Sequence, residues 1–268
     1  MAATTTAPGR HVAGRVLSVL ERNVRATRFG PSYWVMVVAG LFEPLFYLFT
    51  IGAGIGALIN RSVSYAGLSV TYPEYVAPGT LAVSTVSGVF GVSVYSFYNK
   101  LRHARVFEVI LTSPVGSFEV ILGELIWAVA RSGLFGALFL GVMAALDLAA
   151  PLRLVLAFPA VLLVGTAFGA VGMAITTYVR GWQDFDVVTM VQTGLMLFSG
   201  TFFPVTQYPA VVTALVEALP LYHAIELLRG LALGGSGLAL CGHVGYLVVM
   251  LLAGLSVTRR RMDRHLRA

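Results

Sequence analysis

Residues 154–179 read LVLAFPAVLLVGTAFGAVGMAITTYV, a run of 26 residues without one charged side chain. A helix rises about 1.5 Å per residue, so about 20 apolar residues cross the roughly 30 Å hydrocarbon core of a bilayer. This stretch is therefore long and apolar enough to cross a membrane as one helix. It predicts a span at about 153–179 and decides the class of fold to be considered.

The composition of the whole chain agrees with this stretch. Of its 268 residues, 57% are hydrophobic and only 11% are charged, against about 25% in an ordinary soluble domain. The mean hydropathy is +0.84. These values exclude a disordered or collagen-like chain, and the single cysteine, Cys241, excludes an intramolecular disulfide. We expect an all-α polytopic protein of the inner or plasma membrane.

Six stretches have the length and apolar character of membrane spans. They lie at about 33–58, 75–98, 119–146, 153–179, 186–204 and 238–258. The predicted organisation is thus a region of 1–32 before the spans, a six-span domain at 33–258 and a basic tail at 259–268.

Positive charge is distributed unevenly between the two sides of this arrangement. Fourteen of the 18 basic residues lie before the first span, between spans two and three, after span four, or after span six. Cytoplasmic connections carry the excess of Arg and Lys in membrane proteins. Both termini are therefore predicted to be cytoplasmic, and the net charge of +6 reflects membrane orientation and contact with lipid rather than nucleic-acid binding.

The stretch 10–28 before the first span has the pattern of an amphipathic helix. One helical face carries Val12, Val16, Val19 and Leu20, and the opposite face carries Arg15, Arg22 and Arg25. Such a helix lies in the plane of the membrane interface. The alternative is a solvated basic tail that only fixes the topology.

Two connections between spans are more than simple loops. Residues 99–116 begin with a charged segment of helical spacing and end at Ser113-Pro114 and Gly116, which stop a helix. They predict a short cytoplasmic helix that a partner could push, although an ordinary basic loop is the alternative. Residues of about 205–235 contain two pieces of helical periodicity, 209–218 and 221–233, each too short to span. They predict re-entrant or interfacial helices at the extracytoplasmic end.

Four stretches resemble type-2 ABC exporter permeases, especially the branch of nodulation lipooligosaccharide exporters and daunorubicin-resistance permeases. They are Glu43-Pro44 with the aromatic residues after it, YVAPG at 75–79, LTSPVGSFEVILGE at 111–124, and SGTFFPVTQYP…LPLYHAIELLRG within 199–230. The last motif is the most specific, and the resemblance covers about 15–258. It implies six spans, an interfacial helix, a coupling helix at about 99–116 and re-entrant helices at about 205–235.

The resemblance also implies a mechanism that needs other chains. Two permeases, identical or different, would pair, and two ABC ATP-binding subunits would drive export of a hydrophobic or amphipathic substrate. A lipid-linked saccharide, a glycolipid or a lipophilic drug would fit this class. The chain lacks the G-x-x-x-x-G-K-[ST] phosphate loop, since its only lysine, Lys100, lies between Asn99 and Leu101. We therefore expect no enzyme activity and no cofactor in this chain, with ATP and Mg²⁺ bound by the partner.

The candidate contacts with the ATPase lie in the two cytoplasmic helices. They are Arg102, Arg105, Glu108 and Val109 of the predicted coupling helix and Arg22 and Arg25 of the interfacial helix. For each of them the alternative is a charged face at the membrane surface. Glu119 and Glu124, at the start of the third span, are expected to have structural roles.

Two charges lie deep within predicted spans, Glu43 in the first and Arg131 in the third. A charge at such a depth costs a few kcal/mol or more, so a mutual pair, or a gate that uses both, is one interpretation. The alternative is that Glu43 is protonated beside Pro44 while Arg131 extends to the interface. In the competing function, a proton-coupled secondary transporter, Glu43 would be the coupling residue.

The remaining candidates are aromatic and motif residues. Candidates for a substrate path are Phe42, Phe46, Phe90, Phe198, Phe202 and Phe203, for which ordinary packing is the alternative. The residues expected to order the re-entrant motif are Pro204, Pro220, His223, Glu226 and Arg229. No cluster of residues in the sequence indicates a catalytic site or a metal site.

Overall fold

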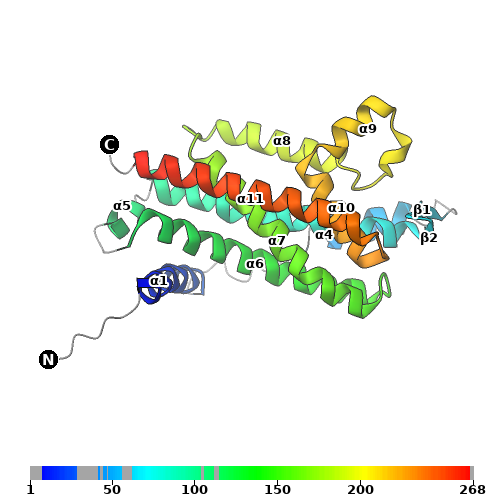
Figure 1. Cartoon of the computed structure of the whole chain (residues 1–268), viewed down its shortest axis with the longest axis horizontal. Coiled ribbons are helices and arrows are strands. Elements are labelled where there is room, and N and C mark those ends of the chain that lie inside the picture. The colour runs from blue at the N-terminus through cyan, green and yellow to red at the C-terminus, as the bar shows by residue number, and fades with distance from the viewer. Residues whose placement is uncertain are drawn as a thin grey trace.

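The computed structural model describes residues 8–28, 42, 45–46, 48–55, 62–103, 106–111 and 115–265. Its main helices are α1 (Pro8–Arg28), α4 (Tyr72–Phe90), α5 (Val106–Leu111), α6 (Ser117–Ala145), α7 (Pro151–Thr176), α8 (Asp184–Phe198), α9 (Ala210–Glu217), α10 (Pro220–Leu233) and α11 (Gly237–His265). Short segments complete the order: η1 (Leu48–Ile55), η2 (Gly91–Ser96), η3 (Asn99–His103) and η4 (Val205–Gln207). Figure 1 shows the long helices side by side in one elongated bundle.

Within the described residues, four helices are long and apolar enough to cross a membrane. They are Tyr72–Arg102, which joins α4 to η2 and η3 in one run, and the greater part of α6, α7 and α11. They match the predicted second, third, fourth and sixth spans, so a polytopic helical membrane protein is confirmed. The predicted fifth span is α8, whose 15 residues fall short of the roughly 20 that a straight crossing needs. The predicted first span falls largely outside the described residues.

The segment predicted as re-entrant forms two helices as expected. α9 and α10 meet at an angle of 84°, which is the geometry of a broken span or a re-entrant loop. Pro220 is the first residue of α10, where its missing N–H is not needed by the helix. The sharp break between the two helices therefore follows from the sequence.

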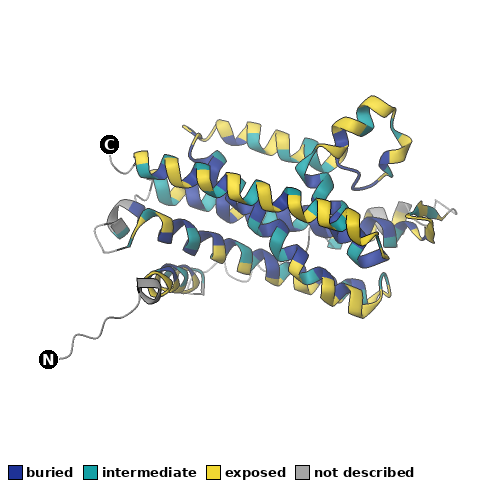
Figure 2. Cartoon of the chain, viewed as in Figure 1, coloured by how far each residue is buried: buried dark blue, intermediate teal, exposed yellow. Residues whose placement is uncertain are grey.

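α7 is the central helix and packs against α4, α6, α10 and α11. Small residues make this possible. A Cβ atom on Gly169 would lie 2.7 Å from Leu125 Cδ1 of α6, and one on Gly254 of α11 would lie 2.8 Å from the backbone of Ala170. The faces of α6 and α11 that point away from the bundle are exposed (Figure 2). Many of these exposed residues are large and apolar, such as Leu138 and Leu252, as expected for a surface that faces lipid.

The two ends of the bundle are built differently. α1, the start of α6 and the end of α11 lie at one end (Figure 1), where the Ser117 hydroxyl donates to Asp263. The start of α4 and the end of α10 lie at the other end. That α1 and the end of α11 share one end is the geometry that an even number of spans requires. Which side is cytoplasmic remains a prediction from the charge distribution.

A small hairpin at the second end corrects the expectation of a purely helical chain. Strands β1 (Val63–Tyr65) and β2 (Leu68–Val70) pair antiparallel. Ala66 and Gly67 join them with φ angles of +49° and +79°. Positive φ at both positions is the signature of the tight turn that matches the twist of a hairpin. The sequence analysis missed it because spans are found with long windows, whereas this pattern occupies only eight residues.

The contact of α11 with α7 provides a test of the packing. We expect Gly254→Leu to lower the free energy of unfolding by about 1–3 kcal/mol. The introduced side chain would collide with the backbone of α7 at Ala170 and Val171, which cannot move aside as a side chain can. Thermal unfolding in a mild detergent measures the effect. Gly242→Leu is the matched control, because nothing lies within 4 Å of a Cβ at that position of the same helix. Equal stability of the two variants would contradict the close approach.

Candidate functional site

The first feature of the site is the packing contact between α1 and α6. Val16 and Val19 are buried, and a Cβ atom on Gly123 would lie 2.7 Å from Val19 Cβ and 3.2 Å from the Val16 carbonyl oxygen. Half of the apolar face predicted to meet lipid is therefore covered by protein, whereas Val12 stays exposed. α1 is thus packed against the start of a membrane helix.

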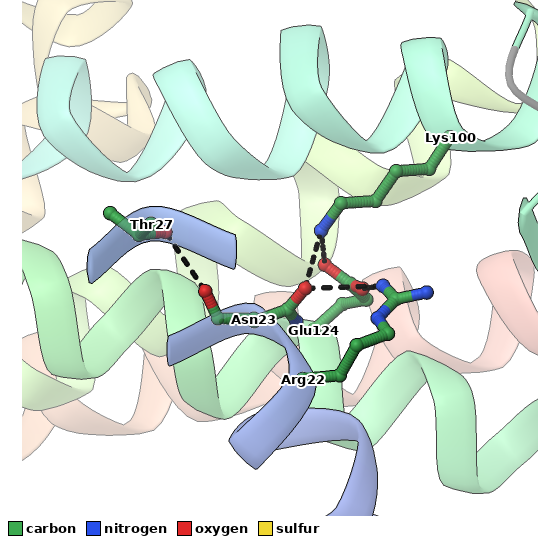
Figure 3. A network of polar contacts seen from close by, with 5 residues as sticks. All are labelled: Arg22, Asn23, Thr27, Lys100 and Glu124. Atoms are coloured by element: carbon green, nitrogen blue, oxygen red, sulfur yellow. Dashed lines mark hydrogen bonds and ion pairs between the residues drawn. The ribbon is translucent and has the colours of Figure 1, made fainter. Parts of the chain in front are cut away.

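A buried carboxylate lies beside this contact. The Glu124 side chain is only 1% exposed, and two cations from different elements hold it. Lys100 Nζ of η3 donates to Glu124 Oε2 at 2.6 Å, and Arg22 Nη2 of α1 donates to Oε1 at 3.0 Å. Asn23 Oδ1 accepts from Lys100 Nζ at 2.8 Å and from Arg22 Nη2 at 3.1 Å. Figure 3 shows these side chains converging from α1, the end of the α4 run and α6.

Glu119 adds a second tie between the same helices. Its Oε2 accepts from the Gly116 N–H at 2.6 Å, and this bond caps the start of α6. Its Oε1 lies 3.3 Å from Arg15 Nη1 of α1. Within α1, Thr27 Oγ1 donates to the Asn23 carbonyl at 2.9 Å. We call Arg22, Asn23, Lys100 and Glu124 the Glu124 cluster; with the Arg15–Glu119 pair, it fixes three elements at one end of the bundle.

The predicted ATPase contacts are placed differently from one another. Arg102 is exposed near the end of η3, which continues the α4 run, and a separate short helix within the predicted segment 99–116 is α5. Arg25 is exposed and pairs with Glu21 on its own helix at 2.5 Å, while Arg22 turns inward to Glu124. Arg105 lies outside the described residues. Glu108 and Val109 belong to α5, but their side chains are also outside the described part of the structure.

A second polar centre lies at the opposite end of the bundle, around Arg229 of α10. This side chain has an exposure of 0%. Nη1 donates to Glu226 Oε1 at 2.5 Å, Nε to the Tyr75 carbonyl at 3.2 Å, and Nη2 to the Gly200 carbonyl at 3.0 Å. The guanidinium also lies 3.9 Å from the centre of the Tyr75 ring. One cation therefore joins α10, the start of α4 and the segment after α8.

The hairpin is tied to the same centre. Tyr65 of β1 donates its hydroxyl to Glu226 Oε2 at 3.1 Å. Burial and, after it, the negative charge of Glu226 raise the pKa of the Tyr65 hydroxyl well above its usual range, so this group stays a donor. Arg229, Glu226, Tyr65 and Tyr75, with the carbonyls of residues 200–201, form what we call the Arg229 centre.

This centre brings together motifs that are far apart in the sequence. Gly79 of the YVAPG stretch would place a Cβ 3.1 Å from the Thr201 carbonyl oxygen and 3.2 Å from Arg229 Nη2. Gly200 has a φ of +74°, which turns the chain after α8. Residues 75–79, 199–204 and 226–230, far apart in sequence, thus meet around one guanidinium. Pro204 directly precedes η4, and its carbonyl oxygen accepts from the Gln207 N–H at 3.1 Å.

His223 joins the re-entrant segment to the last helix. Its Nδ1 lies 2.8 Å from Nδ1 of His243 on α11, and its ring stacks on Tyr246 at 3.9 Å. One nitrogen must donate and the other accept, so two protonated rings are incompatible with this contact. His223 was expected to order the segment, and these contacts are with a neighbouring span.

The proposed intramembrane pair is not tested by the structure. Glu43 lies outside the described residues. Arg131, half-buried on α6, has no ion pair with a carboxylate in the described part of the chain. Their pairing therefore stays a prediction.

The aromatic candidates for a substrate path do not share one environment. Phe90 is buried, and its ring centre lies 6.3 Å from that of Phe168, as the packing alternative predicts. Phe202 is also buried. The exposed members are Phe42, Phe46, Phe198 and Phe203. Phe42 and Phe46 stack at 5.8 Å on one another.

These features define a multi-pass helical membrane protein whose helices are fastened at both ends by buried charges. Residues 15–233 match the ABC-2 type transporter family, so the chain belongs to this family. It is an ABC exporter permease, a transmembrane subunit that is not itself the ATPase, and membership implies association with an ABC ATP-binding subunit.

Relatives of known name cover most of the chain. Nodulation protein J of Rhizobium leguminosarum bv. trifolii is 33% identical over 229 residues, which are 84% of this chain and 86% of that protein. Nodulation protein J of Rhizobium leguminosarum bv. viciae is 30% identical over 254 residues, or 92% of this chain and 95% of the relative. The protein of the same name from Rhizobium meliloti (strain 1021) is also 30% identical, over 84% of this chain and 86% of its own length.

Sequence reasoning missed several residues of both centres. Lys100 was used only in the count of basic residues and as evidence against a phosphate loop, although a lone lysine among 17 arginines is a signal in itself. Tyr75 was noted only as part of the YVAPG motif, and Asn23 and Tyr65 carried no signal in the sequence, because the roles of all three come from neighbours more than 75 residues away.

The Glu124 cluster predicts a large effect from a small change. We expect Glu124→Gln to lower the free energy of unfolding by about 3 kcal/mol, because two cations lose a buried counter-charge. Chemical unfolding in detergent checks this. Glu21→Gln removes a carboxylate from an exposed pair on α1 and should change little. An equally small change in the free energy of unfolding for Glu124→Gln would show that the cluster does not stabilise the fold.

The Arg229 centre predicts that charge alone is insufficient. The planar guanidinium of Arg229 donates to carbonyls of two separate segments at once, which the single ammonium group of lysine cannot do. Arg229→Lys should therefore lower the free energy of unfolding by about 2 kcal/mol. Arg259→Lys, at an exposed position on α11, is the matched control and should be neutral. Thermal unfolding of both variants provides the comparison, and equal melting temperatures would count against this role of the guanidinium.

Proposed function

We propose that this chain moves a hydrophobic or amphipathic substrate outward, powered by separate ATP-binding subunits that act on the end of the bundle holding α1. The observation that carries the proposal is the Glu124 cluster. It links the end of the α4 run, α1 and α6 beside the segment 99–116, where the resemblance expects the coupling helix.

The physical basis is the high cost of separating two opposite charges that are buried against one another. Displacing η3 would pull Lys100 from a carboxylate that is 1% exposed, which is costly in a medium of low dielectric constant. A push on 99–116 is therefore transmitted to Glu124 and Arg22 instead of being absorbed locally. The helices α1, α4 and α6 then respond as one unit to the ATPase.

The partners follow from the same proposal. Two ABC ATP-binding subunits would bind ATP and Mg²⁺, and a second permease, identical or related, would complete the path. With the positive-inside assignment, both termini lie in the cytoplasm and the protein lies in the inner or plasma membrane. A lipid-linked saccharide, a glycolipid or a lipophilic drug would be the substrate, and the similarity to nodulation proteins favours the first two.

The test begins with a mild-detergent pull-down of the tagged chain from its native cells, followed by an ATPase assay and identification of bound proteins. We expect a stoichiometric ATP-binding subunit with ATPase activity. Reversing both charges, with Arg105→Glu and Glu108→Arg, should release that subunit without unfolding the permease. Glu217→Arg, an exposed change on α9 at the other end, is the control and should leave the complex intact.

The opposite result would favour a secondary transporter. A chain that purifies without an ATPase in several detergents, and whose transport persists on a proton gradient after ATP depletion, would overturn the proposal. Loss of that transport in Glu43→Gln would then identify the proton-coupling residue.

A further inference from the structure

An apolar cleft opens on the outer side of the bundle between α7, α10 and α11. Its volume is about 480 Å³, within the range of about 300–1,000 Å³ of small-molecule sites. Its walls include Leu156, Leu163, Leu231, Leu240, Cys241 and Val244. Neither the Glu124 cluster nor the Arg229 centre uses it.

The chemistry of the walls determines what can fill this cleft. Its lining consists of leucine, valine, alanine, proline, glycine and one cysteine, none of which carries a charge. Water is not stable in a cavity that offers it no polar partners. α7 and α11 are both helices of membrane-spanning length, so the medium that meets the cleft is hydrocarbon. A hydrocarbon chain is therefore the occupant that fits.

A cation lies at one end of the cleft. Arg153 is on α7 three residues before Leu156, so the two share a face one helical turn apart. Arg153 Nη1 donates to the Leu233 carbonyl at 2.7 Å, and Leu233 lies just beyond Leu231 of the cleft wall. The guanidinium of Arg153 therefore lies just beyond the apolar residues that α7 and α10 contribute to the cleft.

Most of the hydrogen-bonding capacity of this guanidinium is unused. Arginine carries five N–H donors, and the bond to Leu233 accounts for one of them. The residue is exposed, and no carboxylate in the described part of the chain forms an ion pair with it. A role as a cap for the last carbonyls of α10 explains that single bond but not the cleft that leads to it.

Arg153 is also out of place by charge distribution. It belongs to the few basic residues on the side that the positive-inside rule leaves poor in positive charge. A cation at a membrane boundary, next to a cleft shaped for hydrocarbon, complements a lipid with a negative headgroup. Arginine binds phosphate oxygens through charge-assisted hydrogen bonds.

We propose that the cleft between α7, α10 and α11 binds one anionic phospholipid of the surrounding leaflet, with an acyl chain along the apolar walls and its phosphate on Arg153. Bound there, the lipid braces α10, which carries Arg229, against α7 and α11. The proposal does not depend on the transported substrate or on the ATPase.

The purified full chain in a neutral detergent provides the test. Native mass spectrometry follows the retention of phosphatidylglycerol and, separately, of phosphatidylcholine. We expect one phosphatidylglycerol to be retained more tightly than phosphatidylcholine. Arg153→Gln should weaken this binding about tenfold, the loss of one charge-assisted contact. Arg259→Gln removes the same charge at the other end of α11 and should leave retention unchanged.

Cys241 locates the bound lipid. It is the only cysteine of the chain and it lines the cleft. Its alkylation by N-ethylmaleimide should slow as phosphatidylglycerol is added to the wild-type chain, and should not respond in Arg153→Gln.

A second variant tests the cleft while leaving Arg153 intact. Gly245 lines the cleft, and nothing lies within 4 Å of a Cβ placed there, so Gly245→Phe fills the space from α11. It should abolish the tight retention. Gly242→Phe, on the same helix but outside the lining, is the matched control. Equal retention of both lipids by the wild type, undiminished binding in Arg153→Gln or Gly245→Phe, or unaltered alkylation of Cys241 would overturn the proposal.

Discussion

The structure depends on the cost of burying Glu124. A carboxylate that is 1% exposed cannot remain charged without partners, and the chain supplies them from two other elements. This requirement brings Lys100 at the end of the α4 run and Arg22 of α1 to the same point on α6. Because neither cation is adjacent to Glu124 in sequence, satisfying it fixes the relative position of three elements. The valine face of α1 against Gly123 then completes the contact.

At the other end of the bundle the buried charge is positive, and it belongs to Arg229. Its guanidinium is fully buried, and backbone carbonyls supply much of its hydrogen bonding. Glu226 supplies the one carboxylate, and the carbonyls come from residues 75, 200 and 201, in motifs that contain glycine, proline and aromatic residues. The two ends therefore tolerate change differently. The Glu124 cluster depends on side chains alone, whereas the Arg229 centre depends on its side chains and also on the backbone path that presents the carbonyls.

Between the ends, small residues rather than charges hold the helices together. Gly169 and Gly254 let α6 and α11 approach α7 closely. In lipid, where burial of apolar surface gives no advantage over contact with acyl chains, such close approach and buried polar contacts supply the association energy. A bundle fastened at its ends and close-packed at its centre is compatible with the transmission of displacement proposed for this permease.

The sequence by itself determined what depends on local composition. Long apolar runs predicted four of the membrane helices to within a few residues, proline and spacing predicted the bent pair α9–α10, and amphipathic spacing predicted the helix α1. The family followed from ordered motifs. Only the tertiary structure decided which charges meet. The sequence offered Arg22 as an outward contact and Glu124 as a helix-end carboxylate, and the structure pairs them across 102 positions. The hairpin of residues 63–70 and the convergence of three motifs on Arg229 were likewise undetermined, because a side chain buried far from its partners in sequence is specified by packing and not by its neighbours along the chain.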